Sequence, residues 1–457
     1  MKRRSAALWL VLFAVYAGTI GMRASAGSQY AGAEPHYLLT AKSLVDDGDV
    51  DLADDYRARE YRDFHAGTLR PQGLLTRGRL DEPSGVGFPA FIAPAFAIAG
   101  AKGVEVFLAA VAALAVVLAY RLALLAVPDP WALGATLAVG LSPPLVAYST
   151  AVYPELTAAA LLAGAALLAL RTAERPSRAR AYGCCALVAA LPWLEPKYLI
   201  PGAVVALYAF RKVRQARRPV LAVTALELIG FSAALYVGIS EGLYGGGTPY
   251  SAALAGQSGI DVAFPGVFVG RSYRAVALLI DRDYGLLRWA PVLALAAVGA
   301  VVLWRERRSG LALAIPGLEA EESAALLTGA TALAQLLVAV FLAPTLFGFW
   351  FPARLAVPAM LLAVPLVALG LRRAPRVGTA LALIGVAASV WLYLDVRVGA
   401  GGLASNVPDA PWGPLERAFP LFERGSIYPF VLAGVLALAA AALVVREVRR
   451  VGPVRAA

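Results

Sequence analysis

Residues 32–39 of the chain read GAEPHYLL and place a carboxylate, Glu34, two residues before one of only two histidines, His36. The segment follows the first apolar stretch of a very hydrophobic chain, residues 6–22. Such a carboxylate is a candidate catalytic base, a candidate metal ligand or an early acidic residue of a solvated helix. The choice depends on the kind of protein that surrounds it.

The composition indicates an integral membrane protein. Hydrophobic residues make up 60% of the 457 residues and charged residues only 16%, and the mean hydropathy is +0.69. The net charge of +11 does not indicate a nucleic-acid partner, because the basic residues form short clusters between apolar runs. Cys184 and Cys185 are adjacent in an apolar stretch, so we expect them to pack rather than form a disulfide or a metal site.

Apolar runs that can cross a membrane predict an all-α polytopic fold with about twelve transmembrane helices. Residues 1–26 also resemble a signal peptide, but the many further spans favour an uncleaved first helix within residues 1–22. The predicted spans are residues 6–22, 104–121, 131–147, 153–170, 182–194, 197–210, 219–243, 286–304, 323–343, 355–371, 377–396 and 427–445.

The basic clusters predict the orientation of these spans. All of them fall on one side of the membrane if both termini are cytoplasmic, as the positive-inside rule requires. A large extracytoplasmic loop, residues 23–103, then precedes a bundle, residues 104–457, with outer loops at 244–285 and 397–426. The clusters are residues 2–4, Arg121, and residues 171–180, 211–218, 305–308, 372–376 and 446–450.

The apolar segment VGFPAFIAPAFAIAG, residues 86–100, must not cross the membrane in this scheme. It is short, has two prolines and ends in glycine, which favours a helix that lies in the interface or dips into it. A crossing would make the basic clusters alternate between the two sides.

The first loop begins with a predicted helix over residues 34–47. Helical spacing puts Leu38, Ala41 and Val45 on one face, which we expect to pack on the bundle. From Glu34 to Asp63 the chain has nine acidic residues against four basic ones, a pattern typical of a solvated loop. A calcium site is the alternative, although the run lacks the terminal glutamate of a full ligand loop.

Several stretches resemble the GT-C membrane glycosyltransferases, the superfamily of the protein O-mannosyltransferases and the lipid A aminoarabinose transferases. The similarity begins with GAEPHYLLTAKSLVDDGDVDLADDY at 32–56 and continues to the tenth predicted span. The further stretches are GVGFPAFIAPAFAIAG at 85–100, SPPLVAYSTAVYPE at 142–155, LPWLEPKYL at 191–199, DRDYGLLRWAP at 281–291 and FWFPARLAVP at 349–358.

The resemblance implies a GT-C-like fold and an inverting transfer of a sugar from a polyprenyl-phosphate carrier at the outer membrane face. The acceptor is a glycolipid, a polysaccharide or a protein. In the superfamily an acidic residue of the first loop, often in an Asp-Glu pair, is the general base. The pair reads Ala33-Glu34 in this chain, so either Glu34 acts alone or the enzyme is impaired.

Residues at the outer ends of the predicted spans are candidates for binding the substrate. Arg354 and Lys197 are placed to bind the lipid phosphate, with Arg288 a weaker candidate; snorkelling to the interface is the alternative. Glu155 and Glu195 are placed to bind sugar hydroxyls, orient Lys197 or help hold a divalent metal, and capping is an alternative for Glu155. Tyr37 and His36 complete the predicted substrate site, although neighbouring acids also explain His36.

Two other functions fit a chain of this kind. A non-catalytic GT-C-like scaffold that binds membrane lipid is suggested by Ala33, which stands where the superfamily often has a second carboxylate. A secondary transporter would also have many spans, but the chain lacks the matching halves and midplane charges typical of transporters.

The predicted topology can be tested with single cysteines in a chain whose Cys184 and Cys185 are replaced by alanine. A membrane-impermeant thiol reagent added to intact cells should label a cysteine at Asp55 and leave cysteines at Arg214 and Arg307 unlabelled. The opposite labelling pattern would invert the scheme.

Overall fold

A computed structural model shows an almost entirely helical protein. The only sheet among the described residues is a hairpin of two antiparallel strands, β1 (Leu75–Thr76) and β2 (Arg79–Leu80). The structure describes residues 2–25, 27–73, 75–76, 78–250, 269–308, 318–343, 350–399, 401–404, 419–422 and 427–451.

The helices fall into a first-half and a second-half series. The first series is α1 (Lys2–Ala17), α2 (Glu34–Asp46), α3 (Ala53–Ala58), η1 (Glu60–Asp63), α4 (Gly87–Ala126), α5 (Trp131–Gly140), α6 (Pro143–Tyr148), α7 (Glu155–Glu174), α8 (Arg178–Leu194), η2 (Pro196–Tyr198), α9 (Leu199–Gln215) and α10 (Pro219–Tyr244). The second is α13 (Arg274–Ile280), α14 (Leu286–Trp289), η3 (Pro291–Ala294), α15 (Leu295–Arg308), α17 (Leu318–Leu337), η4 (Val338–Leu342), η5 (Arg354–Ala356), α18 (Val357–Leu362), α19 (Val364–Arg373), α20 (Pro375–Val398) and α22 (Tyr428–Val451).

Six helices in the described part of the chain are long and apolar enough to cross a membrane, and a pair bent by 61° would make a seventh span. The predicted multi-pass membrane character is therefore confirmed. Every predicted span coincides with one helix or with a series of short ones, but several of these helices are short, so the count of twelve stays a prediction. The qualifying helices are Gly87–Ala126, Glu155–Glu174, Pro219–Tyr244, Ser323–Leu342, Pro375–Val398 and Tyr428–Glu447, and the bent pair is Arg354–Leu362 with Val364–Arg373.

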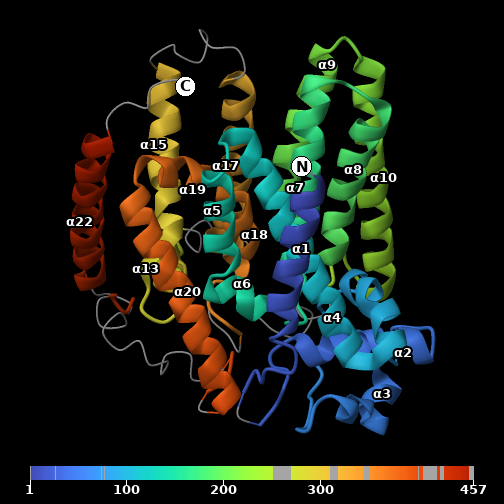
Figure 1. Ribbon diagram of the computed structural model, residues 1–457. Helices are drawn as coiled ribbons and strands as arrows, with labels where there is room; N and C mark the ends of the chain where they lie inside the picture. Colours follow the sequence, from blue (N-terminus) through green and yellow to red (C-terminus); the bar gives the residue numbers. More distant parts are fainter. Residues whose placement is uncertain are drawn as a thin grey trace.

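The first helix of the chain begins at the same end of the bundle at which the last helix ends. Figure 1 shows the start of α1 and the end of α22 there, and shows α2 and α3 at the opposite end. This arrangement agrees with the two termini being on one side and the first loop on the other. The membrane side of each end stays a prediction, as does the division into a first loop, residues 23–103, and a bundle, residues 104–457. Much of the predicted outer loops 244–285 and 397–426 lies outside the described residues.

The apolar segment 86–100 forms a helix that is separated from the next span. The backbone leaves the helical conformation at Ala99 and at Gly100, whose φ of 60° and ψ of −150° belong to a region that is essentially restricted to glycine. The glycine that ends the predicted interfacial helix therefore marks the break between the two parts of α4. That the first part does not cross the membrane stays a prediction.

Helix α2 matches the predicted helix within one residue, Glu34–Asp46. The predicted packing face is correct for Leu38 and Ala41, which are fully buried, but wrong for Val45, which is 37% exposed. Val45 is the last residue of that face and lies one residue before the end of the helix at Asp46.

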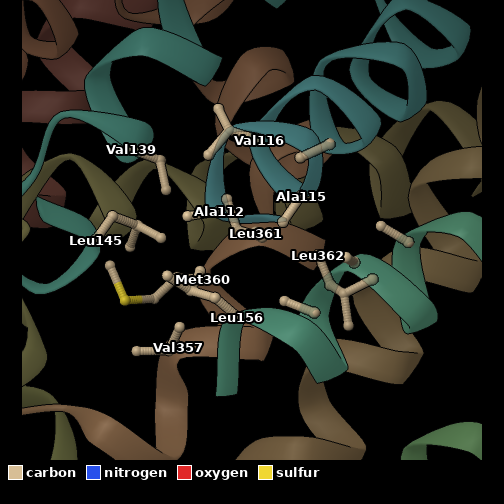
Figure 2. Close-up of a cluster of buried hydrophobic side chains, with 14 of the residues drawn as sticks. Ala112, Ala115, Val116, Val139, Leu145, Leu156, Val357, Met360, Leu361 and Leu362 are labelled. Carbon is tan, nitrogen blue, oxygen red and sulfur yellow. The ribbon is translucent and has the colours of Figure 1, made fainter. Parts of the chain in front are cut away.

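A core of small and branched side chains fixes the helices that carry the charged residues. Figure 2 shows residues of α4, α5, α6, α7 and α18 meeting in one cluster, including Ala112, Val139, Leu156 and Val357. Alanines let the helices approach closely, which is how helices associate in a membrane, where lipid removes the hydrophobic driving force. Leu156 and Val357 therefore anchor the chain next to Glu155 and close to Arg354.

Candidate active site

Glu34 lies at the start of α2 and is almost completely buried, with 5% of its surface exposed. Its Oε1 accepts a hydrogen bond from the Val152 backbone N–H (2.8 Å), and its Oε2 accepts one from the Ala31 N–H (2.9 Å). These bonds fix the carboxylate between the first loop and the segment before α7.

The surroundings of Glu34 make it a stronger base than an ordinary carboxylate. Burial raises the pKa of Glu34 to about 7, although the two backbone N–H groups lower it. The negative charge of Glu105 raises the pKa further, and the positive charge of Arg354 lowers it. Glu34 can therefore exchange a proton near neutral pH.

Arg354 forms a buried ion pair with Glu155, a residue far away in the sequence. The Arg354 Nε lies 2.7 Å from Glu155 Oε1. The guanidinium carbon lies 4.0 Å from the centre of the Tyr153 ring and 5.0 Å from that of Trp350, so two aromatic rings also contact the cation. Ala353, directly before Arg354, has a φ of 65°, a strained conformation for a residue with a side chain.

Lys197 and Glu195 extend this ion pair into a network. The Lys197 Nζ lies 3.0 Å from Glu155 Oε1 and also pairs with Glu195, and Glu195 Oε1 lies 3.5 Å from the Arg354 Nη2. Tyr37 of α2 donates a hydrogen bond to Glu195 Oε1 (2.9 Å). The predicted residues Tyr37, Glu155, Glu195, Lys197 and Arg354 are thus brought together.

Two polar atoms of this network have no hydrogen-bond partner within the described part of the chain. They are the second carboxylate oxygen of Glu155 and the hydroxyl of Tyr198, both fully buried. Buried polar atoms are rarely left without a partner, so the network has capacity for a further polar group.

Tyr153 joins the Glu34 site to the ion-pair network. Its ring lies under Arg354, and its hydroxyl donates a hydrogen bond to the carbonyl of Ala31 (3.0 Å), the residue whose N–H binds Glu34. Glu34 and the two cations therefore belong to one site.

Two pockets border the site. Tyr153 and Trp350 form part of the wall of the pocket beside Glu34. The other pocket borders Glu195, with Trp193, Tyr236 and Tyr244 in its wall. Aromatic walls next to polar groups are suited to substrates that have both apolar and hydroxyl-bearing parts.

His36 and Arg288 lie in other surroundings. His36 Nδ1 is 2.8 Å from the Tyr56 hydroxyl and 3.0 Å from Glu82 Oε1, so it connects α2 to the rest of the first loop, as the alternative with neighbouring acids suggested. Arg288 is buried, donates to the Arg282 carbonyl, and lies over the Trp289 ring. Substrate binding by these two residues stays a prediction.

Among the described residues, no group of three or more His, Cys, Asp or Glu side chains could hold a metal ion. Glu155 and Glu195 instead contact Arg354 and Lys197. The calcium alternative for the acidic loop and a metal role for these two glutamates stay predictions.

Sequence reasoning missed Glu105, which lines the same pocket as Glu34. The signal was available: Glu105 is the only acidic residue in the 40 residues of α4, and it lies near the start of a predicted span. A carboxylate in an apolar helix is costly and commonly has a functional reason.

Comparison with solved structures finds proteins of similar fold, whereas comparison of the sequence does not find a relative. No protein-family model and no curated protein matches the chain. The apo crystal structure of ArnT from Cupriavidus metallidurans is similar over 97% of this chain and 78% of that chain, with a TM-score of 0.53 and 14% identity. ArnT is a GT-C glycosyltransferase, so the resemblance seen in the sequence is confirmed at the level of the fold.

Two further solved structures are less similar. ArnT from Cupriavidus metallidurans bound to undecaprenyl phosphate has a TM-score of 0.48 and 16% identity, with 97% of this chain and 73% of that chain covered. The archaeal oligosaccharyltransferase AglB from Archaeoglobus fulgidus, in complex with an inhibitory peptide and a dolichol-phosphate, has a TM-score of 0.44 and 14% identity, with 99% and 57% covered.

The ion-pair network should be essential for stability. Glu155→Gln leaves the buried Arg354 and the partly buried Lys197 without one of their two counter-charges, and breaking a buried pair in this way costs about 3–5 kcal/mol. We expect a clear fall in the thermal unfolding temperature of the protein in nanodiscs. Glu241→Gln, the same change at an exposed position of α10, is the control. Equal unfolding temperatures for the two variants would contradict a structural role of the pair.

Proposed function

We propose that this protein is a membrane glycosyltransferase that moves a sugar from a polyprenyl-phosphate carrier to an acceptor hydroxyl, with inversion. This proposal rests on one observation. Tyr153 connects Glu34, a buried carboxylate of raised pKa, to the two cations Arg354 and Lys197. Such a transfer needs a base for the acceptor and positive charge for the departing phosphate.

Glu34 is the general base in this mechanism. As the acceptor oxygen forms a bond to the anomeric carbon, its proton passes to a carboxylate oxygen of Glu34. The bond from the anomeric carbon to the phosphate oxygen breaks on the opposite face, and the electron pair leaves with the polyprenyl phosphate. A pKa of about 7 suits the carboxylate for accepting this proton near neutral pH.

Arg354 and Lys197 bind the phosphate in this mechanism. They stabilise the negative charge that grows on the leaving group, and the low dielectric of a buried site strengthens this effect. Glu155 and Glu195 balance the two cations while the donor is absent, which prevents their mutual repulsion inside the protein.

The fold supports a donor of this class, because the ArnT fold also occurs in a structure bound to undecaprenyl phosphate. The pocket beside Glu34 is suited to the acceptor or the sugar, because Tyr153 and Trp350 offer ring faces and the carboxylates accept hydrogen bonds from hydroxyls. A glycolipid, a polysaccharide and a protein remain the candidate acceptors.

Replacing the base should abolish most of the activity without unfolding the protein. Glu34→Gln should lower turnover by about 10²–10⁴-fold, the usual effect of losing a positioned base. The measurement is the release of undecaprenyl phosphate from a panel of undecaprenyl-phosphate-linked sugars in nanodiscs that contain membrane lipid extract. In the wild type, kcat/KM should fall as the pH drops below about 7, because protonated Glu34 cannot accept a proton.

Asp47→Asn is the matched control, since it makes an acid-to-amide change at the exposed far end of α2. Wild-type turnover by Glu34→Gln would exclude the base assignment. A wild-type protein that binds the donor and releases no phosphate would instead be the lipid-binding scaffold.

Removing the guanidinium should weaken binding of the carrier phosphate. Arg354→Lys keeps the charge but loses the planar group that lies over Tyr153 and can donate two parallel hydrogen bonds. We expect the Kd for undecaprenyl phosphate in nanodiscs to rise by about tenfold or more, which corresponds to about 1.4 kcal/mol. Arg397→Lys, at the exposed end of α20, is the control. Equal affinity of both variants at several salt concentrations would return Arg354 to an interfacial or structural role.

A further inference from the structure

Glu105 is a second buried carboxylate beside Glu34. Only 3% of its surface is exposed, and it lies on α4, five residues after the break at Gly100. Ala33, the residue before Glu34 in the sequence, cannot supply a charge. Glu34 and Glu105 line the same pocket, so the two carboxylates of this pocket come from different elements.

Three donors hold Glu105 in one orientation. Its Oε1 accepts hydrogen bonds from Gln29 Nε2 (2.5 Å) and from the Tyr30 hydroxyl (2.8 Å), and its Oε2 accepts one from the Gly21 N–H (3.0 Å). Hydrogen bonds from three donors offset part of the cost of burying a charged carboxylate. Glu105 thus places a carboxylate in a fixed orientation at the pocket.

Adjacent residues connect this charge to the base. The Tyr30 hydroxyl binds Glu105, and the backbone N–H of the next residue, Ala31, binds Glu34. Residues 30–31 therefore hold the two carboxylates at a fixed separation on one wall of the pocket. Like charges in a buried setting disfavour each other's ionisation, so Glu105 favours the protonated form of Glu34.

We propose that Glu105 is the electrostatic partner of Glu34, a positioning residue on α4 that supplies the second carboxylate of the site in place of residue 33. This inference rests on the proposed function for its catalytic consequence: the charge of Glu105 strengthens Glu34 as a proton acceptor. A purely structural role, in which Glu105 only ties residues 21–30 to α4, would leave the protonation of Glu34 unchanged.

Other groups near Glu34 also act on its protonation. These groups must stay unchanged in the Glu105 variants. Arg354, for example, lowers the pKa of Glu34, whereas Glu105 raises it. The charged and titratable groups that interact with Glu34 are Glu105 of α4, Arg354 of η5, Tyr30 of the first loop, Tyr148 of α6 and Tyr153 before α7.

The test measures the protonation of Glu34 without any substrate. Dicyclohexylcarbodiimide modifies protonated carboxyl groups in apolar surroundings, and mass spectrometry of the Glu34 peptide at different pH values gives the midpoint of the reaction. In the full-length protein in nanodiscs, Glu105→Gln keeps the size of the side chain and removes its charge. We expect the midpoint to fall by about one pH unit. Glu105→Asp, which keeps the charge, should restore a midpoint near that of the wild type.

The outcomes separate this inference from the proposed function. An unchanged midpoint in Glu105→Gln would overturn the electrostatic role, whether or not the protein is active. A shifted midpoint in a protein without transferase activity would support the pairing and contradict the proposed function. If Glu105→Gln does not fold, Glu105→Ala replaces it. Failure of both neutral variants to fold would assign Glu105 a structural role and overturn the inference.

Discussion

The need to neutralise buried charge governs the arrangement of this protein. Arg354 and Glu155 are separated by 199 positions in the sequence, yet their side chains lie 2.7 Å apart in almost complete isolation from solvent. Neither charge is stable there alone, because transferring an unpaired ion from water into an apolar interior costs several kcal/mol. The start of α7 and the segment before α18 therefore have to meet, and the aliphatic core beneath them keeps them in place.

The same network attaches the first loop to the bundle. Tyr37 reaches Glu195 at the end of α8, and Glu34 accepts a hydrogen bond from the Val152 N–H before α7. One turn of α2 thus contacts two regions that are far away in the sequence. The proposed role of Glu34 as a base requires a position that is fixed relative to the other reacting groups, and these two contacts provide that constraint.

The sequence predicted the elements of the site better than their pairing. The predicted helix over residues 34–47 placed the start of α2 at Glu34, and the outer ends of the spans identified Arg354, Lys197, Glu155 and Glu195 as candidates. Which acid meets which cation depends on tertiary packing, and no local pattern contains that information. His36 shows the same effect, because its partner Glu82 lies 46 positions away, on the far side of the hairpin.

Two errors of sequence reasoning have physical causes. Val45 has the correct helical spacing for burial but lies one residue before the end of α2, and periodicity contains no information on where a neighbouring surface ends. Glu105 was hidden by its apolar neighbours, because a search for spans averages hydropathy over a window and discounts a single charge. In a membrane protein that single charge is more informative than the average.

The balance of charge at the site links binding of the donor to the strength of the base. Without a ligand, Arg354 lowers the pKa of Glu34, while burial and Glu105 raise it. In the proposed mechanism a bound phosphate offsets part of the positive charge of Arg354, and the pKa of Glu34 then rises. The carboxylate would become a better proton acceptor only when the donor is in place, and an acceptor that arrived first would meet a weaker base. Electrostatics alone would thus favour transfer over premature activation of the acceptor, without any conformational change.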